Sequence, residues 1–212
     1  MAQKVEKRPA ANRLVRADWV AAAKDILIAD GIKGLSLRRL ATSLNMTTGG
    51  FYWLFDNFEE LLDDLRTHWE VENSRHFNEV FESTELDSKH KYIGYLRILF
   101  NVHLYQPSYD NAMRDWARSS SETAALIEKV DARRITQLKN MYLGFGYIEL
   151  TSLVKAEIAY FHQVGYYMVG VNEDVDIRLS KIPYYADLIY PGIIPLDISL
   201  DDLKALILVD PE

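Results

Sequence analysis

The run of residues 36–55, SLRRLATSLNMTTGGFYWLF, constrains the fold more than any other part of the sequence. Its first half repeats apolar residues at positions i, i+3, i+4 and i+7, which is the spacing of one buried stripe on a helix. These residues are Leu37, Leu40, Ala41 and Leu44. Ser36 stands directly before them and is a suitable N-cap. The spacing therefore predicts a short helix that buries one face.

A turn and a second short helix are expected next. Asn45 stands where the backbone should take a positive φ, a conformation that Asn tolerates, and Thr47 or Thr48 can cap the following helix. That helix should span about nine residues, since helical spacing continues to the end of the run. Its apolar side carries Phe51, Leu54 and Phe55. Its other side carries Thr48, Gly49, Tyr52 and Trp53.

Two adjacent glycines, Gly49 and Gly50, lie inside this second helix. Each should destabilise a helix by about 1 kcal/mol relative to Ala, so a local reason for them is expected. Close approach of the backbone to a partner outside is one such reason. A helix-turn-helix that exposes hydroxyls, small residues and an aromatic pair suits duplex DNA, because its second helix enters the major groove. The alternative is a helical hairpin inside an ordinary core.

Residues 17–62 resemble the DNA-binding domain of the TetR family of bacterial repressors. The resemblance rests on SLRRLA followed by MTTGGFYWLF. The family pattern is a Thr/Ser-X-Arg-X-Leu-Ala helix, a Gly-Val-Ser turn and then Gly-X-Leu-Tyr-X-X-Phe. The matching positions are Ser36, Arg38, Leu40, Ala41, Thr47, Gly49, Phe51, Tyr52 and Phe55. The pattern and the resemblance together predict DNA contacts at Arg38, Thr47, Thr48, Gly49, Gly50, Tyr52 and Trp53.

Three positions depart from the family pattern. Asn45 replaces the usual turn glycine, Phe58 replaces a lysine, and Asp56 stands where other members carry a base or a proline. The second helix therefore has no cation of its own. The net charge is −7, but residues 1–55 carry nine Lys or Arg against four acidic residues, a charge of +5 that leaves −12 for the rest. A basic DNA-binding head on an acidic body is predicted.

The expected organisation is all-α, with three segments. Residues 1–13 carry four bases and no apolar period, so they are expected to be a flexible arm that adds phosphate or minor-groove contacts; a solvated tail is the alternative. Residues 14–57 are the helix-turn-helix domain, whose first helix should run from Asp18 as N-cap to Gly31. Residues 58–212 are the helical effector-binding and dimerisation domain. Its first helix is expected to follow a capping box of Asp56 and Glu59 and to end near Phe81.

Within residues 58–212, helices are expected at 92–105, 110–119, 122–143 and 150–169, with a final short helix around 200–207. Pro107 is interpreted as a break inside the domain, and residues 172–199 receive no functional assignment. The resemblance implies that residues 122–143 and 150–169 form a homodimer interface and that the dimer binds a palindromic operator in double-stranded DNA. A row of Asp64, His68, Glu72 and His76 at four-residue spacing is interpreted as a solvated polar face and not as a metal site.

The resemblance also implies a small-molecule effector in residues 58–212. Many aromatic residues there are either core or pocket lining. Those singled out for the effector are Phe100, His103, Tyr109, Met113, Trp116 and Phe161. The sequence has no Cys and no GxSxG, HExxH or phosphate-binding glycine loop, so neither an enzyme nor a cofactor is predicted. It also has no apolar run of 18 residues, so a cytoplasmic protein without a membrane span is expected. A regulator of the same fold without an effector, and an all-helical enzyme with a dispersed acid/base site, remain as alternatives.

Overall fold

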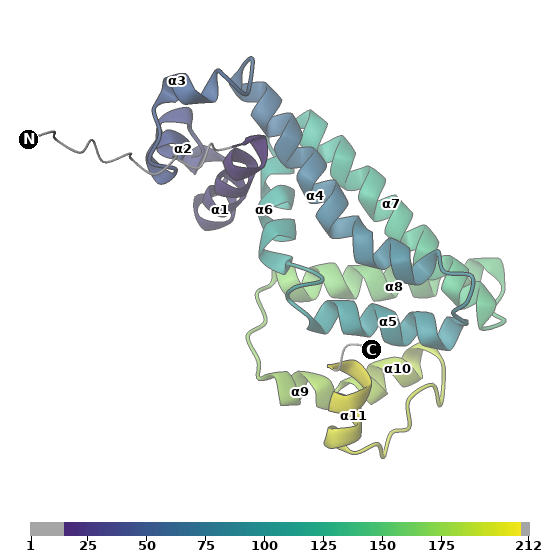
Figure 1. Cartoon of the computed structure of the whole chain (residues 1–212). Coiled ribbons are helices and arrows are strands. Elements are labelled where there is room, and N and C mark those ends of the chain that lie inside the picture. Colours follow the sequence, from purple (N-terminus) through teal and green to yellow (C-terminus); the bar gives the residue numbers. More distant parts are fainter. Residues whose placement is uncertain (1–14, 209–212) are drawn as a thin grey trace, which may run out of the picture. The chain divides into compact units, whose positions relative to one another are not determined.

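The computed structural model describes residues 15–208, and within that range the chain is entirely helical apart from its connections (Figure 1). The predicted all-α fold is confirmed. The chain forms two compact units, one ending at Leu65 and the other beginning at Arg66. We call residues 15–65 the head and residues 66–208 the body. The helix α4 (Phe58–Phe81) starts in the head and continues into the body, so the boundary between the units lies within this helix and not before it.

The head contains α1 (Arg16–Gly34), α2 (Leu37–Ser43), α3 (Thr48–Phe51) and the first turns of α4. Its core is aromatic, because the Phe51 ring stacks on Phe55 with 4.7 Å between centroids and meets Trp19 edge-on at 5.3 Å. Leucines complete this core, and those that are fully buried are Leu27, Leu40, Leu61 and Leu65. The apolar stripe predicted for residues 37–44 thus faces the core through Leu40 and Ala41.

The predicted ends of α2 are present. The Ser36 hydroxyl accepts a hydrogen bond from the Arg39 backbone N–H, and Asn45 has φ of 53°. Another predicted cap is shifted. Asp18 lies in the first turn of α1, where its carboxylate accepts from the Val15 N–H at 2.7 Å, so it is not the N-cap. The helix α1 is interrupted at the predicted stop, Gly31, whose φ of 68° is not helical, and a short helical segment follows it to Gly34.

The cap of α4 lies one residue later than the predicted Asp56–Glu59 box. Asn57 accepts from the Glu60 N–H at 3.0 Å, and the Glu60 carboxylate accepts from the Asp56 N–H at 2.6 Å. The predicted pair and the observed pair can both bond the free backbone N–H groups at a helix start. The residue types alone therefore did not determine at which residue the helix begins.

The helix α3 is shorter than predicted. It has four residues, Thr48–Phe51, and a turn over residues 52–54 replaces the rest of the expected nine-residue helix. The low helix propensity of Gly49 and Gly50 accounts for this, because two adjacent glycines in so short a helix disfavour its extension. Thr47 occupies the N-cap position, although its side chain makes no capping hydrogen bond.

The body continues with α5 (Ser88–Phe100), α6 (Pro107–Ala117), α7 (Ser121–Gly144) and α8 (Glu149–Met168). These helices match the predicted segments to within a few residues, as does α11 (Leu200–Ile207). Pro107 is the first residue of α6 and not a break, because the first turn of a helix needs no N–H from that position. Two short helices, α9 (Val175–Ser180) and α10 (Ile182–Ile189), were not predicted. Pro183 stands in the first turn of α10, a position that tolerates proline.

A buried polar network joins four helices of the body. Asp110 of α6 accepts from the Asn73 amide of α4 at 3.0 Å and from Arg114 Nε at 2.8 Å. Arg114 also donates to both carboxylate oxygens of Asp131 of α7, at 3.0 and 2.8 Å. Tyr160 of α8 donates to Asp131 at 2.6 Å. The charges of the network are thus paired, as buried charges must be.

Candidate functional site

The residues predicted to contact DNA lie on one short stretch of the head. Arg38 is exposed on α2, and Thr47, Thr48 and Gly49 are exposed at the start of α3, while Gly50 is half-buried. Tyr52 is 60% exposed and Trp53 is 86% exposed. We call these seven residues the α2–α3 surface. The large aromatic side chains Tyr52 and Trp53 face outward while their neighbours Phe51 and Phe55 are buried, which fits the predicted division of the two faces.

Gly49 is not required by the folded head. A Cβ atom at Gly49 would meet only the Thr47 Oγ1 atom, at 3.7 Å, which is an ordinary contact. A Cβ atom at Gly50 would meet the end of the flexible Met46 side chain at 3.1 Å. Positive φ does not explain either glycine. The space in front of Gly49 is therefore open to a partner.

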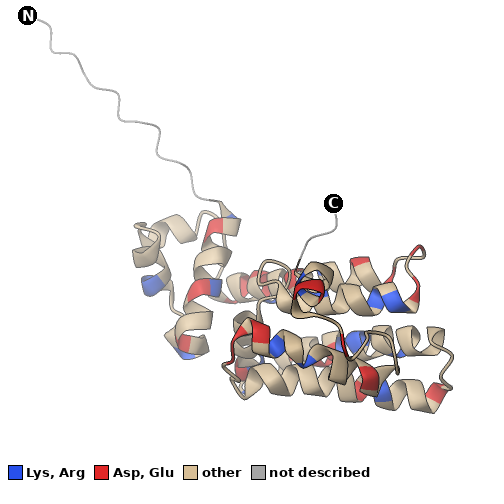
Figure 2. Cartoon of the chain, turned by 90° about the horizontal axis from the view of Figure 1, so that it is seen from below, with Lys and Arg blue, Asp and Glu red and all other residues tan. Residues whose placement is uncertain are grey.

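At least two of the five cations of the described head form ion pairs within the head. Arg16 bonds Glu60 at 2.6 Å and Asp64 at 2.8 Å, and these hydrogen bonds raise the pKa of Arg16. Arg39 forms an ion pair with Asp30. Residues 15–65 contain five basic and eight acidic residues, a formal charge of −3, and Figure 2 shows both signs interspersed on the helices of the head. The basic arm predicted at residues 1–13 lies outside the described residues.

The six residues predicted for an effector are not brought together by the fold. Tyr109, Met113 and Trp116 are buried in the packing of α6, whereas His103 and Phe161 are exposed. Phe100, at the end of α5, lines a cavity of the body. The other five do not line this cavity, because they lie on other helices or on other faces.

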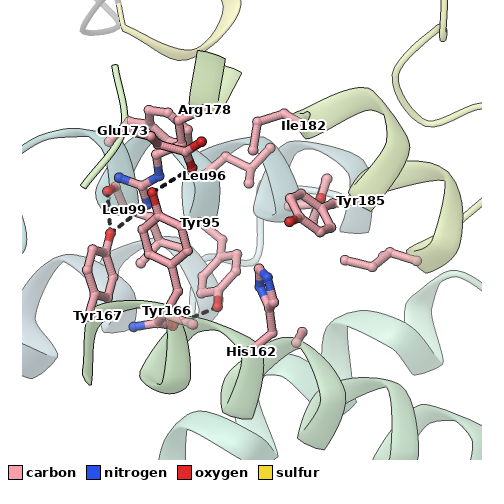
Figure 3. Close-up of a pocket in the computed structure, with 15 residues that line it drawn as sticks. Tyr95, Leu96, Leu99, His162, Tyr166, Tyr167, Glu173, Arg178, Ile182 and Tyr185 are labelled. Atoms are coloured by element: carbon pink, nitrogen blue, oxygen red, sulfur yellow. Dashed lines mark hydrogen bonds between the residues drawn. The ribbon is translucent and has the colours of Figure 1, made fainter. Parts of the chain in front are cut away.

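The body cavity has a volume of about 80 Å³ and lies between α5, α8, α9 and α10 (Figure 3). Aromatic rings and aliphatic side chains make up most of its wall. The lining includes Tyr92, Tyr95, Leu96, Leu99, Phe100, His162, Gln163, Tyr166, Tyr167, Glu173, Arg178, Ile182 and Tyr185. Most of these lining residues were not predicted from the sequence, because α9 and α10 were not predicted. The tyrosine pairs at 166–167 and 184–185 were the available signal.

Arg178 is the cation of the cavity wall. Its guanidinium lies 4.1 Å from the centroid of the Phe100 ring and 4.8 Å from that of Tyr166, and its Nη2 donates to the Tyr167 hydroxyl at 2.7 Å. Figure 3 shows Arg178 beside Tyr166 and Tyr167, with His162 and Tyr185 farther along the cavity. The His162 and Tyr185 rings are 4.7 Å apart. Burial and the nearby Arg178 lower the pKa of His162, so this imidazole is neutral at pH 7.

A row of exposed apolar side chains follows one side of α8. It consists of Leu150, Val154, Ile158, Phe161 and Met168, which we call the α8 stripe. The intervals of three, four and seven residues place these side chains on the same side of the helix. Phe161 therefore belongs to this stripe and not to the cavity. Exposed rows of this length on a helix are typical of interaction surfaces.

Metal-binding and membrane-spanning features were also considered for residues 15–208. In this range no group of three His, Asp or Glu side chains is arranged to hold a metal ion. Asp64 of the polar row pairs with Arg16, and His76 contacts Glu79 at 2.9 Å. Over the same residues, no helix combines the length and apolar character needed to cross a membrane.

Comparison with known proteins places the head in a family. Residues 20–65 match the model of the bacterial regulatory proteins of the tetR family. No curated protein matches the chain. A solved structure described as BioQ with its natural double-stranded DNA operator aligns with a TM-score of 0.40 and 23% identity, over 85% of this chain and 98% of that chain. The head, over residues 20–65, is thus similar to the bacterial regulatory proteins of the tetR family.

Proposed function

We propose that the protein is a dimeric transcriptional repressor that binds a palindromic operator and leaves it when a small molecule occupies the body. The observation that carries this proposal is the α2–α3 surface. There Tyr52 and Trp53 are exposed beside the open backbone of Gly49, on a helix pair whose other face buries Leu40, Ala41, Phe51 and Phe55. In the folded monomer Tyr52 packs edge-on against Phe51 at 5.3 Å and still leaves 60% of its surface exposed, whereas a major-groove partner uses both rings and the open backbone.

Each part of the α2–α3 surface has a distinct role in this proposal. The hydroxyls of Thr47, Thr48 and Tyr52 donate to phosphate oxygens and fix the position of the head on the duplex. Gly49 and Gly50 allow the start of α3 to approach the base edges closely. Trp53 packs against the sugar-phosphate backbone.

The charge for binding comes mainly from outside the α2–α3 surface. Arg38 is exposed, but Arg16 and Arg39 neutralise acidic residues of the head itself. Each phosphate contact contributes through counterion release, so a single head with so few available cations would bind DNA weakly. The basic residues of segment 1–13 and the second head of a dimer supply the missing charge.

Dimerisation uses the α8 stripe together with α7. The stripe exposes Leu150, Val154, Ile158 and Phe161, and a second copy related by two-fold symmetry would cover them. A two-fold dimer presents two recognition helices about 34–36 Å apart, one turn of DNA, and therefore prefers a palindrome.

The body cavity is the effector site in this proposal. A ligand that binds one arrangement of the body more tightly than another shifts the population toward the arrangement it prefers. α4 continues from the head into the body, so an arrangement in which the heads no longer match adjacent grooves releases the operator. The small volume of the cavity, about 80 Å³, favours as a second candidate a regulator of the same fold that needs no effector. The family match at residues 20–65 favours a regulator over an enzyme.

Selection of bound duplexes from a random pool tests the proposal. We expect enrichment of a palindrome with half-sites centred about one helical turn apart. The winning duplex is then used to screen small molecules for release. Enrichment of single, unpaired half-sites, or no enrichment at all, would contradict a dimeric operator-binding protein. Binding without release by any small molecule would favour the regulator without an effector.

A further inference from the structure

We propose that the body cavity binds a small aromatic carboxylate whose carboxylate group pairs with the guanidinium of Arg178. The inference deepens the proposed function, on which it rests only in taking this cavity as the effector site. It is carried by the aromatic wall of the cavity and by the unused hydrogen-bonding capacity of Arg178.

The wall of the cavity suits a planar, apolar body. Rings from α5, α8 and α10 surround it, and Leu96, Leu99 and Ile182 fill the spaces between them. The hydroxyl of Tyr95 donates to Gln163 Oε1 at 2.7 Å, and that of Tyr167 donates to the Leu99 carbonyl oxygen at 2.8 Å. These polar groups are therefore already engaged and present their ring faces or edges to the cavity. Aromatic rings prefer offset-stacked or edge-to-face neighbours, which a flat ligand ring provides.

Arg178 provides the charge. A guanidinium has five N–H donors, and the described chain uses one of them, in the hydrogen bond from Nη2 to Tyr167. The rings of Phe100 and Tyr166 pack against the guanidinium at 4.1 and 4.8 Å. Packing of this kind holds the side chain in place and leaves the in-plane donors for a hydrogen-bonding partner. A carboxylate matches the guanidinium fork and can accept two parallel hydrogen bonds.

The acidic residue of the wall, Glu173, forms its hydrogen bonds with groups other than Arg178, although the charge of Arg178 contributes to lowering the pKa of Glu173. Glu173 accepts from the Tyr166 hydroxyl at 2.8 Å and forms an ion pair with Lys181. Between residues 15 and 208, no carboxylate lies within ion-pair distance of Arg178. Arg178 thus borders an aromatic cavity without an ion-paired carboxylate, and its remaining N–H donors can bond a ligand carboxylate, whereas a ligand cation would be repelled.

The size of the cavity limits the ligand to about one ring. Its volume of about 80 Å³ is smaller than the ~150 Å³ of an engineered cavity that binds benzene. A side chain at the border must therefore turn outward when a ring enters. Tyr185 is placed for this movement, because it is 38% exposed and lies against the ring of His162. Neutral His162 then offers a ring nitrogen to the entering ligand.

Calorimetry on the full-length protein tests the inference with three one-ring probes of similar shape: benzoate, benzamide and benzylamine. We expect benzoate to bind at least tenfold more tightly than benzamide, because only benzoate can form the charged pair with Arg178. Benzylamine should bind most weakly. Equal affinities for benzoate and benzamide, tighter binding of benzylamine, or no binding of benzoate at millimolar concentration would each overturn the inference.

Substitution of the arginine locates the site. Arg178→Gln should reduce benzoate affinity at least tenfold and leave benzamide affinity nearly unchanged. The matched control is Arg133→Gln, which removes an exposed arginine of α7 that does not line the cavity and should leave benzoate affinity unchanged. An equal loss in both variants would contradict a role for Arg178. If Arg178→Gln does not fold, the comparison of the three probes on the unsubstituted chain still tests the inference.

Operator binding separates this inference from the proposed function. Benzoate that binds through Arg178 without releasing the selected operator would leave the inference intact and contradict release by an effector. Release by an uncharged or cationic molecule, with no selective binding of benzoate, would support the proposed function and overturn the carboxylate assignment.

Discussion

The head and the body place their candidate functional residues in opposite ways. The α2–α3 surface comes from one stretch of 16 residues, 38–53, and its aromatic side chains are exposed. The body cavity collects residues from 92 to 189, on four helices, and covers most of them. In the head, local helical spacing decides which side chains face outward. In the body, the packing of distant helices decides which side chains line a cavity, and of the six residues predicted for an effector only Phe100 lines the body cavity.

The largest expected effect separates two neighbouring aromatic residues of the head. Phe51→Ala should lower the free energy of unfolding by about 3–5 kcal/mol, because Phe51 is fully buried against Trp19 and Phe55. Trp53→Ala should change it by no more than about 0.5 kcal/mol, because its side chain is 86% exposed. Urea denaturation measures both. Similar losses in the two variants would show that Trp53 belongs to the core and that the division of the two faces is wrong.

Removing an acidic residue from the buried polar network of the body should lower the free energy of unfolding by about 3 kcal/mol. Asp110→Ala leaves Arg114 with fewer partners in a site where Asp110 is only 3% exposed. Asp115→Ala on the same helix is the control, because Asp115 is exposed and lies 3.7 Å from Arg118. The control should lose less than about 0.5 kcal/mol in the same denaturation experiment. Equal losses would mean that the network adds no more stability than an ion pair at the surface.

A smaller change in free energy is expected for assembly through the α8 stripe. Ile158→Glu places a charge at a position that is 64% exposed in the single chain and covered in the proposed dimer. We expect the dimer dissociation constant, measured by analytical ultracentrifugation, to rise at least tenfold, which is about 1.4 kcal/mol. Ile177→Glu makes the same change at an exposed position of α9 and should have no effect. If only Ile177→Glu dissociates the dimer, the interface lies on the other side of the body.

The smallest effect concerns pH. The pKa of His162 is lowered in the folded chain by burial and by Arg178, so the unfolded chain takes up the proton more readily. Stability should therefore rise with pH from the lowered folded pKa up to the ordinary value of about 6.5 and stay level above it. Thermal unfolding of His162→Gln should show a weaker rise across this window. An unchanged or steeper rise would mean that other groups dominate.

The parts of the fold that follow from local rules were predictable from sequence. Ser36 as a cap, Asn45 with positive φ and the helices of residues 107–168 all depend on neighbours within a few positions. The length of α3 was wrong, because a helix pattern does not say whether Gly49 and Gly50 will end the helix. The state of Arg39 was also missed, since its partner Asp30 lies on another helix.

The cavity was not predictable for a related reason. Phe100, predicted for an effector, lines the cavity, whereas Arg178 stands on α9, a helix that was not predicted. Tyr109, Met113 and Trp116 follow helical spacing, and that spacing reflects their burial in the core. A sequence pattern reports that a face is buried and does not report whether the buried face meets another helix or an empty space.

The affinity of Gly49→Leu for the selected operator tests the central claim most directly. The structure has open space at Gly49, so this variant should fold as stably as the unsubstituted chain or more stably. Ala29→Leu, at an exposed position of α1, is the control for added bulk in the head. We predict that Gly49→Leu loses operator affinity at least a hundredfold in fluorescence anisotropy while Ala29→Leu binds normally. A folded Gly49→Leu protein that binds the operator as tightly as the unsubstituted chain would contradict docking through the α2–α3 surface.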